Sequence, residues 1–587
     1  MKAKHIIYVI LGILTLGMSS CSDFFDQDSD HVTFADDKNI NEPGDTIYSL
    51  TGILQQLQAL GDRTVLLGEA RGDLVSVTNA ASSDLRDLAN FNVGDDNKYN
   101  SPRDYYAVIN NCNFYIAKCD TAVKDSRNNY IFMKEYAAVK AIRAWTYLQL
   151  AINYGHVPFV TEPILTKEQS DATYPTQDIQ GICEYFLKDL APLANVARPG
   201  LGTIGSYDSR FLYFPINIVM GDLNLWSGHS GHYADAALCY YRYITTANGN
   251  NSYFPIGVDM VQWTNSNWTS VSAFGEIRSV SETWSSGREL ITMIPGDSLP
   301  SQGNYSQLRN IFNSSETNNY EVSLTPSKSL IDLSNSQSNN ILTSEGDVIY
   351  TPSGLSENRS GDLRLNMVWS SQNNLRVGSK RVDYQHISKF SSRNIHIYRK
   401  AMVYLRLAEA LNRAGYPHFA YQILARGVNN SVISEYVLPY CKTASDSAFV
   451  EQFNFPNTAT TGYLVFDIRN TDSPVNTIGI HSRGSGWACY DKNYQMPDDS
   501  TLTDETARKN YQIEKVEDMI VDENALECCF EGTRYYDLLR VALRRNDPTY
   551  IAKKLKNRNG SGNDSGITKS LSDWKDFFLS WKGKIGY

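Results

Sequence analysis

The chain has 587 residues, with 64 acidic and 54 basic side chains and a formal net charge of −10. An acidic chain without a block of basic residues argues against a nucleic acid as a partner. Its length allows a large buried core, in several domains or in one elaborated domain.

The N-terminus carries a short apolar segment followed by a cysteine. Lys2 and Lys4 precede an apolar run over residues 6–17, and small residues lead to Cys21. The run is shorter than the roughly 20 helical residues that cross a bilayer. The pattern predicts a signal peptide over residues 1–20 that is removed before Cys21. It resembles the bacterial lipoprotein signal, whose cysteine is acylated, with palmitate among the expected chains, and anchors the protein to a membrane. The alternative is an ordinary signal peptide with a chance cysteine.

Residues 21–41 form a polar, acidic segment with little apolar pattern. Asp26, Asp28 and Asp30 alternate as at the start of a calcium loop, but His31 stands where that loop needs glycine. We interpret the segment as a solvated tether for a domain over residues 42–587.

Helical patterns dominate this domain. Apolar residues recur at helical spacing over residues 105–119, 130–154, 216–226, 233–244, 401–411 and 419–428. Gly155 ends the second helix, and Gly415 separates the last two. Five alanines between residues 137 and 151 predict a helix that packs on more than one side. Helix pairs with glycine turns resemble tetratricopeptide units, but they follow no fixed period, so insertions must interrupt any array.

The longest insertion covers residues 249–386 and is rich in Ser, Asn, Gly and Thr. It contains Trp263, Trp268, Trp284 and Trp369, and a short strand-like run over residues 348–350. A span of this length is either disordered or a functional surface. Its four tryptophans favour the functional surface.

The cysteines other than Cys21 show no C-x-x-C pair, so disulfides are not needed. Cys112 and Cys119 are about 10 Å apart along a predicted helix, which is too far for a bridge. Cys528 and Cys529 could form a redox pair, but two small apolar residues on a helix are the favoured interpretation.

Motifs of known catalytic chemistry are absent from the sequence. We find no H-E-x-x-H, P-loop, G-x-G-x-x-G or G-x-S-x-G in a supporting context. His229 and His232 flank a turn without a further ligand nearby, so we predict no metal site and no cofactor. Counting acidic residues does not exclude a glycosidase pair, because such carboxylates meet only in three dimensions.

The most specific motif lies in the last helical region. Residues 522–540 read DENALECCFEGTRYYDLLR. This segment resembles the E-x-x-x-E-F-x-x-E-G-x-R-x-x-D-L-x-R signature of the SusD/RagB family of outer-membrane nutrient-binding lipoproteins. Residues 143–150, 154–158, 225–229 and 404–412 agree with the family in order and position.

The residues of this signature also predict a local structure. Phe530 is expected to finish a helix, Gly532 to break it and Thr533 to cap the next helix. Glu531, Arg534, Asp537 and Arg540 are spaced by three residues and are expected to pair along one helix face. We therefore interpret the signature as structural, with a catalytic role for Glu531 and Asp537 as the alternative.

The resemblance implies a mostly helical SusD-like fold with four tetratricopeptide-like helix pairs and loop-rich insertions that form a ligand face. It implies a non-catalytic, outward-facing lipoprotein of the outer membrane that delivers oligosaccharides to a TonB-dependent transporter of the SusC type. The RagB branch binds peptides, so peptide uptake is an alternative. A surface glycoside hydrolase and a purely structural partner of the transporter are further hypotheses.

The resemblance also places two regions near the ligand face. Aromatic rings there would stack on sugar faces, and polar groups would bind hydroxyls, although each tryptophan could instead pack its loop on the scaffold. The early loop supplies Arg71, Asp73, Asp84, Phe91 and Tyr99, and the insertion supplies Trp263, Trp268, Trp284 and Tyr305. A third loop, residues 479–487, could present Arg483 and Trp487 outward, or its glycines could lock it against the helices.

Overall fold

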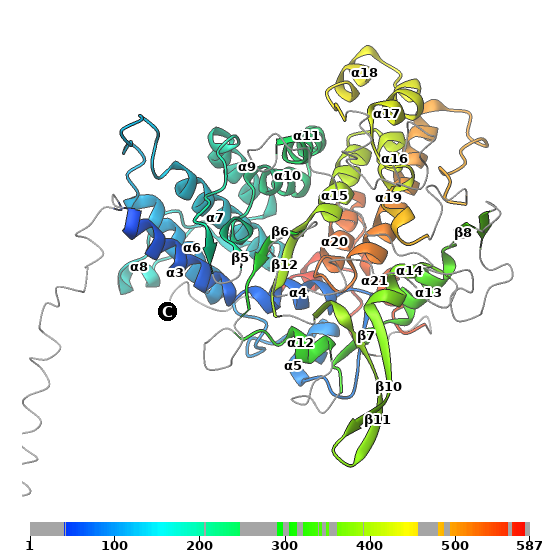
Figure 1. Ribbon diagram of the computed structural model, residues 1–587, viewed down its shortest axis with the longest axis horizontal. Coiled ribbons are helices and arrows are strands. Elements are labelled where there is room, and N and C mark those ends of the chain that lie inside the picture. Colours follow the sequence, from blue (N-terminus) through cyan, green and yellow to red (C-terminus); the bar gives the residue numbers. More distant parts are fainter. Residues whose placement is uncertain are drawn as a thin grey trace, which may run out of the picture.

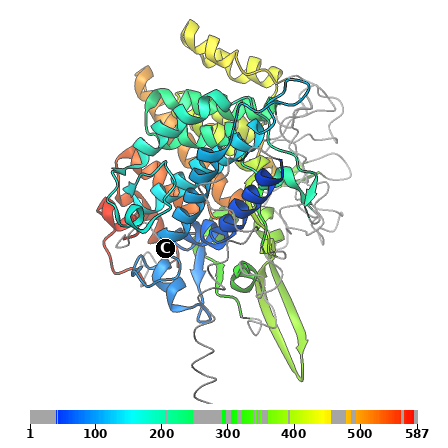
Figure 2. The ribbon, with the colours of Figure 1, turned by 90° about the vertical axis from the view of Figure 1, so that its left-hand side faces the viewer.

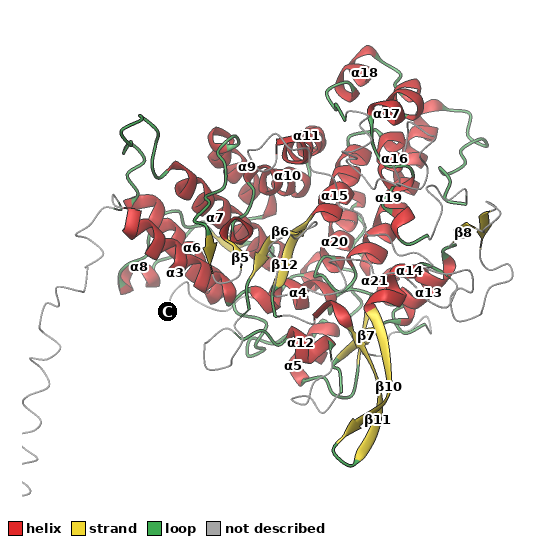
Figure 3. Cartoon of the chain, in the orientation of Figure 1, coloured by secondary structure: helices red, strands yellow, loops and turns green. Residues whose placement is uncertain are grey.

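The computed structural model describes residues 40, 43–204, 207–246, 290–296, 305–313, 321–338, 340–342, 348–350, 361–390, 393–455, 479–485, 493–560 and 566–580. This part of the chain is mostly helical, which confirms the predicted fold class (Figure 3). Within these ranges, no helix combines the length and the apolar character that crossing a membrane requires.

Nine helices described before the insertion include one long helix, α7, on which several others pack. They are α3 (Pro43–Gln58), α4 (Gly61–Glu69), α5 (Ser83–Ala89), α6 (Pro102–Lys118), α7 (Met133–Tyr154), α8 (Lys167–Asp171), α9 (Ile179–Leu190), α10 (Ile216–Trp226) and α11 (Ser230–Thr246). The central helix α7 packs against α6, α9 and α10, as its alanines predict. It ends where Gly155 adopts a φ of 76°, a conformation that favours glycine.

The later helices form the other half of the scaffold (Figure 1). They are α12 (Leu308–Phe312), α13 (Lys328–Ser336), α14 (Leu363–Val368), α15 (Lys400–Arg413), α16 (Pro417–Ala425), α17 (Asn430–Tyr436), α18 (Ala444–Val450), α19 (Glu505–Cys528), α20 (Arg534–Arg545) and α21 (Thr549–Leu555). Consecutive helices pack in pairs: α6 with α7, α10 with α11, α15 with α16, and α19 with α20. The second and third of these are the pairs predicted from residues 216–244 and 401–428. Contacts of α11 with α15 and of α16 with α19 join these pairs into one scaffold.

The strands form two-stranded antiparallel pairs in the described part of the chain. The pairs are β1 (Val75–Val77) with β7 (Leu324–Pro326), β2 (Val157–Pro158) with β3 (Thr176–Gln177), β4 (Thr203–Ile204) with β5 (Tyr207–Asp208), β6 (Leu290–Ile294) with β12 (Ile395–Arg399), β8 (Asn340–Leu342) with β9 (Val348–Tyr350), and β10 (Trp369–Val377) with β11 (Lys380–Ile387). The strand-like run at residues 348–350 is therefore confirmed as β9. The β10–β11 hairpin projects from the helical body (Figures 1 and 2).

The junction between α19 and α20 differs from its prediction. The helix α19 ends at Cys528, because Phe530 and Gly532 have φ angles of 71° and 86°. Thr533 precedes α20 but its side chain accepts no capping hydrogen bond, since its backbone is already helical. The buried cysteines Cys528 and Cys529 are free thiols, in agreement with their interpretation as small apolar residues.

Candidate functional site

The early loop residues lie inside the scaffold. Arg71 donates to the carbonyl oxygen of Leu67 at 2.8 Å, and its guanidinium lies 3.9 Å from the centre of the Tyr535 ring. Asp73 is buried and accepts from Arg534 at 2.5 and 3.0 Å. Their positions are thus explained by contacts with α20, and their role in ligand binding stays a prediction.

The predicted aromatic residues of the early loop are also buried. Phe91 is 4% exposed and lies edge-on to Phe577, with ring centres 6.4 Å apart. Tyr99 is 6% exposed, whereas Asp84 at the start of α5 is half-buried. A stacking platform for a ligand needs an exposed ring, so the burial of Phe91 and Tyr99 argues against such a platform in this conformation. Their contact with a ligand stays a prediction.

The insertion is described only in part. Tyr305 is half-buried, and the guanidinium of Arg393 lies 3.4 Å from the centre of its ring. The other predicted residues, Cys21, Trp263, Trp268, Trp284 and Trp487, lie outside the described residues. The roles of these residues therefore stay predictions.

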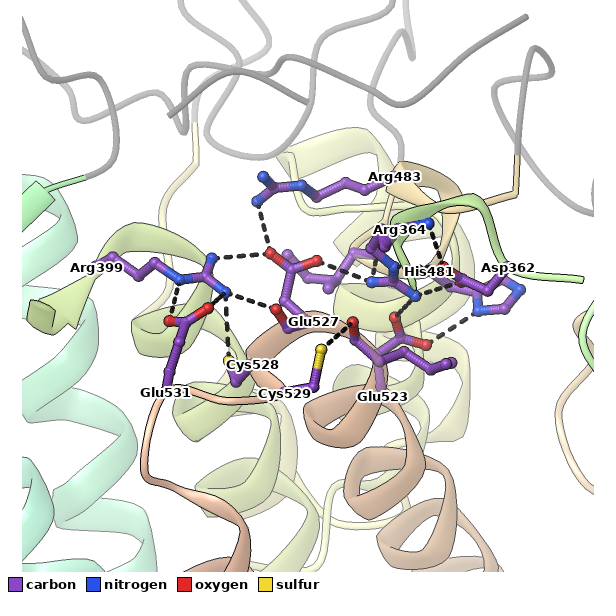
Figure 4. A network of polar contacts seen from close by, with 12 residues as sticks. Asp362, Arg364, Arg399, His481, Arg483, Glu523, Glu527, Cys528, Cys529 and Glu531 are labelled. Atoms are coloured by element: carbon purple, nitrogen blue, oxygen red, sulfur yellow. Dashed lines mark hydrogen bonds and ion pairs between the residues drawn. The ribbon is translucent and has the colours of Figure 1, made fainter. Parts of the chain in front are cut away.

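Arg483 belongs to a buried group of charges, which we call the ionic cluster (Figure 4). Its members are Asp362, Arg364, Lys389, Arg399, His481, Arg483, Glu523, Glu527 and Glu531. Arg483 is 1% exposed and lies 3.2 Å from Glu527. The prediction that its loop presents Arg483 outward is wrong, and the alternative, a loop locked against the helices, is confirmed for this residue. Whether Arg483 takes part in binding stays a prediction.

Glu527 stands at the centre of the ionic cluster. Figure 4 shows three arginines converging on its carboxylate, and Arg364 and Arg399 both approach to 2.8 Å. Burial alone would raise the pKa of Glu527, but the three guanidiniums hold that pKa well below its usual range. A carboxylate held ionised in this way is a structural anchor, not a proton donor.

Glu523 and Glu531 extend the ionic cluster in both directions from Glu527. Glu523 contacts Arg364 at 2.6 Å and the Nδ1 atom of His481 at 3.0 Å. Burial alone would raise the pKa of Glu531, but Arg399 and Lys389 hold it at about 2. The three glutamates of the signature therefore fasten α19 and the turn after it to β12, to the 3₁₀ turn at residues 388–390 and to residues 479–485.

The remaining charges of the signature pair mainly over long distances in the sequence. Arg540 binds Glu409 of α15 at 2.8 and 3.0 Å, and it also lies 2.5 Å from Asp537. Arg534 binds Asp73, so pairing along one face holds only for Asp537 and Arg540. The prediction fails for the others because the break at Gly532 places Glu531 outside α20.

An open groove lies elsewhere, beside α16. This α16 groove has a volume of about 610 Å³ and lies between the start of α16, the end of α17, the 3₁₀ turn Leu438–Tyr440, residues 495–499 and the first turns of α19. Its lining includes Tyr416, His418, Tyr421, Gln422, Arg426, Tyr436, Tyr440, Lys442, Asp446, Gln495, Asp498, Asp499, Glu505, Arg508, Lys509 and Gln512.

A tyrosine–histidine stack forms one wall of the α16 groove. The rings of Tyr440 and His418 are nearly parallel, with an angle of 11° and centres 3.5 Å apart. Tyr440 is 53% exposed and lines the groove. Burial lowers the pKa of His418 to about 4, so its ring is uncharged at neutral pH.

Polar groups and a second stack complete the groove. Asp499 accepts from Gln512 at 2.7 Å and from Arg508 at 2.9 Å. Tyr421 donates to the carbonyl oxygen of Tyr494 at 2.6 Å, and the Tyr494 ring stacks on His481 of the ionic cluster. The groove is therefore held on a rigid base and combines an open aromatic face with hydrogen-bonding groups, as small-molecule sites do.

This groove is not among the sites predicted from the sequence. Four tyrosines and a histidine between residues 416 and 440 are a signal that could have found it. The described residues contain no group of three or more metal-ligating side chains, and His229 and His232 instead lie beside Glu184 and Ser227 at 3.0 and 2.7 Å.

Comparisons with known proteins identify the fold. No protein-family model and no curated protein matches the sequence. A solved SusD superfamily protein from Bacteroides vulgatus ATCC 8482 is similar over 93% of this chain and 96% of its own, with 15% identity and a TM-score of 0.55. A SusD-like carbohydrate binding protein from Bacteroides fragilis NCTC 9343 is similar over 86% and 87%, with 12% identity and a TM-score of 0.51. A SusD superfamily protein from Parabacteroides distasonis ATCC 8503 is similar over 85% and 89%, with 16% identity and a TM-score of 0.50. The chain therefore has the SusD-like fold.

Proposed function

We propose that this protein is a cell-surface, glycan-binding lipoprotein of the SusD/RagB family, without catalytic activity of its own. The observation that carries the proposal is the similarity of most of the chain to a SusD-like carbohydrate binding protein. The signature at residues 522–540 supports it, because the charges of the signature join the scaffold together instead of forming a catalytic pair.

The proposed place of action is the outer face of the outer membrane. Acyl chains on Cys21 contribute about 0.8 kcal/mol per buried CH₂ group and would hold the protein there. The tether at residues 21–41 would then let the helical domain deliver oligosaccharides to a TonB-dependent transporter of the SusC type. The transporter should co-purify with the tagged protein from membranes of the native host.

Glycan capture at the predicted ligand face depends on aromatic platforms. Stacking of one ring contributes on the order of 1 kcal/mol, so loss of a true platform weakens affinity several-fold or more. Calorimetric titration of Trp268→Ala, Trp284→Ala and Trp487→Ala tests the face. Parental affinity and melting temperature in all three variants would exclude a platform at these positions.

The experiment for the function as a whole is a glycan array probed with the full chain. We expect retention on a limited set of oligosaccharides and no release of product. Retention of peptides alone would favour the RagB-type alternative, and turnover abolished by changing one carboxylate would favour a glycoside hydrolase.

A further inference from the structure

We propose that the α16 groove is a binding site for a neutral glycan chain, with Tyr440 as its stacking platform. This inference rests on the proposed function for the class of ligand. It adds a site that lies apart from the early loop and the insertion, and it specifies the charge of the glycan.

The platform is already built in the free protein. A pyranose ring presents an apolar C–H face that packs on an aromatic ring, and binding is tighter when the ring does not have to be ordered first. Tyr440 meets this condition, because His418 stacks on its ring with centres 3.5 Å apart, while the Tyr440 residue stays 53% exposed. The support is uncharged at neutral pH, since burial lowers the pKa of His418 to about 4.

An unused hydrogen-bond acceptor points to a polar ligand. Gln422 lines the groove and is 4% exposed, and its Oε1 atom has no hydrogen-bond partner among the described residues. A buried acceptor costs free energy unless a donor reaches it, and a sugar hydroxyl is such a donor. Gln495 and Gln512 also line the groove, and their amides can both donate and accept.

The charges of the groove select against charged glycans. Four basic residues line it, namely Arg426, Lys442, Arg508 and Lys509, and four acidic residues balance them, namely Asp446, Asp498, Asp499 and Glu505. Two of the cations are already paired, Arg508 with Asp499 and Lys442 with Glu505, both at 2.9 Å. A uronate-rich or sulfated chain needs an excess of positive charge, and the chain as a whole carries −10.

Affinity electrophoresis of the full chain tests this assignment. The gels contain neutral polysaccharides (amylopectin, xyloglucan or galactomannan) or anionic ones (polygalacturonate or chondroitin sulfate). We expect a neutral polysaccharide to retard the parent, Tyr440→Ala to weaken the affinity about tenfold, and Tyr440→Phe to stay within about twofold of the parent. The matched control is Tyr130→Ala, because Tyr130 is 52% exposed and does not line the groove, and it should bind as the parent does.

A second variant separates binding from folding. Gln422→Leu replaces the amide by an apolar side chain of similar size and so removes the acceptor. We expect this variant to lose at least threefold in affinity and to keep the parental melting temperature. If Tyr440→Ala melts early, the affinity of Gln422→Leu decides the question.

The outcomes distinguish the inference from the function on which it rests. Parental affinity for a neutral glycan in both Tyr440→Ala and Gln422→Leu would overturn the groove and leave glycan binding intact. Retardation by anionic polysaccharides alone would overturn the proposal that the bound glycan is neutral. Binding of a casein digest that depends on Tyr440 would show that the groove takes a peptide and not a glycan. If no polysaccharide retards the parent, the proposed glycan-binding function itself is overturned.

Discussion

Gly532 occupies a position that requires glycine. Its φ is 86°, and a Cβ atom there would lie 2.3 Å from the carbonyl oxygen of Thr64 and 2.7 Å from the Cα atom of Val65. A Cβ atom on Gly68 would in turn lie 1.8 Å from the oxygen of Gly532. The turn of the signature therefore rests directly on the backbone of α4.

Replacing Gly532 tests this contact. We expect Gly532→Val to destabilise the fold by about 3 kcal/mol or more, because both the φ angle and the space exclude a side chain. Thermal unfolding followed by circular dichroism measures the effect. Gly52→Ala is the control, since Gly52 lies in α3 with nothing within 4 Å of its Cβ position. Equal melting temperatures for Gly532→Val and the parent would refute the account.

Glu69 gives a prediction for the pH dependence of stability. Burial raises its pKa to about 7, against the opposing hydrogen bonds from the backbone amides of Gly532 and Phe530. Because the pKa of Glu69 is higher in the folded than in the unfolded protein, its contribution to the stability of the fold is fully present below the unfolded pKa of about 4.5. That contribution is lost as the pH rises through the folded pKa of about 7. The size of the loss is at most about 3 kcal/mol.

Glu69→Gln isolates this contribution, because glutamine keeps the acceptor for Gly532 but does not titrate. Urea unfolding at pH 5.5 and pH 8.5 gives the free energy of unfolding of both proteins. We expect the parent to lose more stability than the variant between pH 5.5 and pH 8.5. The same pH slope in parent and variant would disprove the prediction.

At the scale of elements, the ends of several helices could be predicted from the sequence. The helix at residues 216–226 has the predicted bounds, and Gly155 ends α7 as expected, because apolar period and chain breaks are local signals. The end of α19 is set instead by contact of Gly532 with α4, which lies more than 450 residues earlier. The residues around position 532 alone do not predict such a long-range contact.

The candidate sites also depend on contacts between residues that are distant in the sequence. Arg71 and Phe91 are buried by Phe577 and α20, which are distant in the sequence, so their exposure could not be judged from the early loop alone. The α16 groove was missed because its walls come from residues 415–446 and 495–512. No single segment of the sequence contains the site.

Arg534 tests how α20 is joined to the early loop. Arg534→Ala leaves Asp73 buried without its partner, so we expect a loss of about 3–5 kcal/mol of stability with ligand affinity unchanged. The control is Lys553→Ala, whose pair with Asp547 is exposed and contributes less than about 1 kcal/mol. Affinity that collapses at parental stability would instead assign Arg534 to a binding site.

At the scale of the whole molecule, membrane attachment depends in our proposal on a single thiol. Cys21 directly follows the predicted signal peptide. We expect Cys21→Ala to leave the domain folded and to move the protein from the detergent phase to the aqueous phase in detergent phase separation. A variant that partitions as the parent does would rule out the lipoprotein assignment.

The central claim is that the molecule binds glycans and does not cleave them. Calorimetric titration of the full chain with the polysaccharide that retards it most, followed by a reducing-end assay on the same mixture, tests this claim most directly. We predict saturable binding heat and no new reducing ends. The absence of saturable binding to any glycan, or reducing ends whose release one carboxylate substitution abolishes, would contradict it.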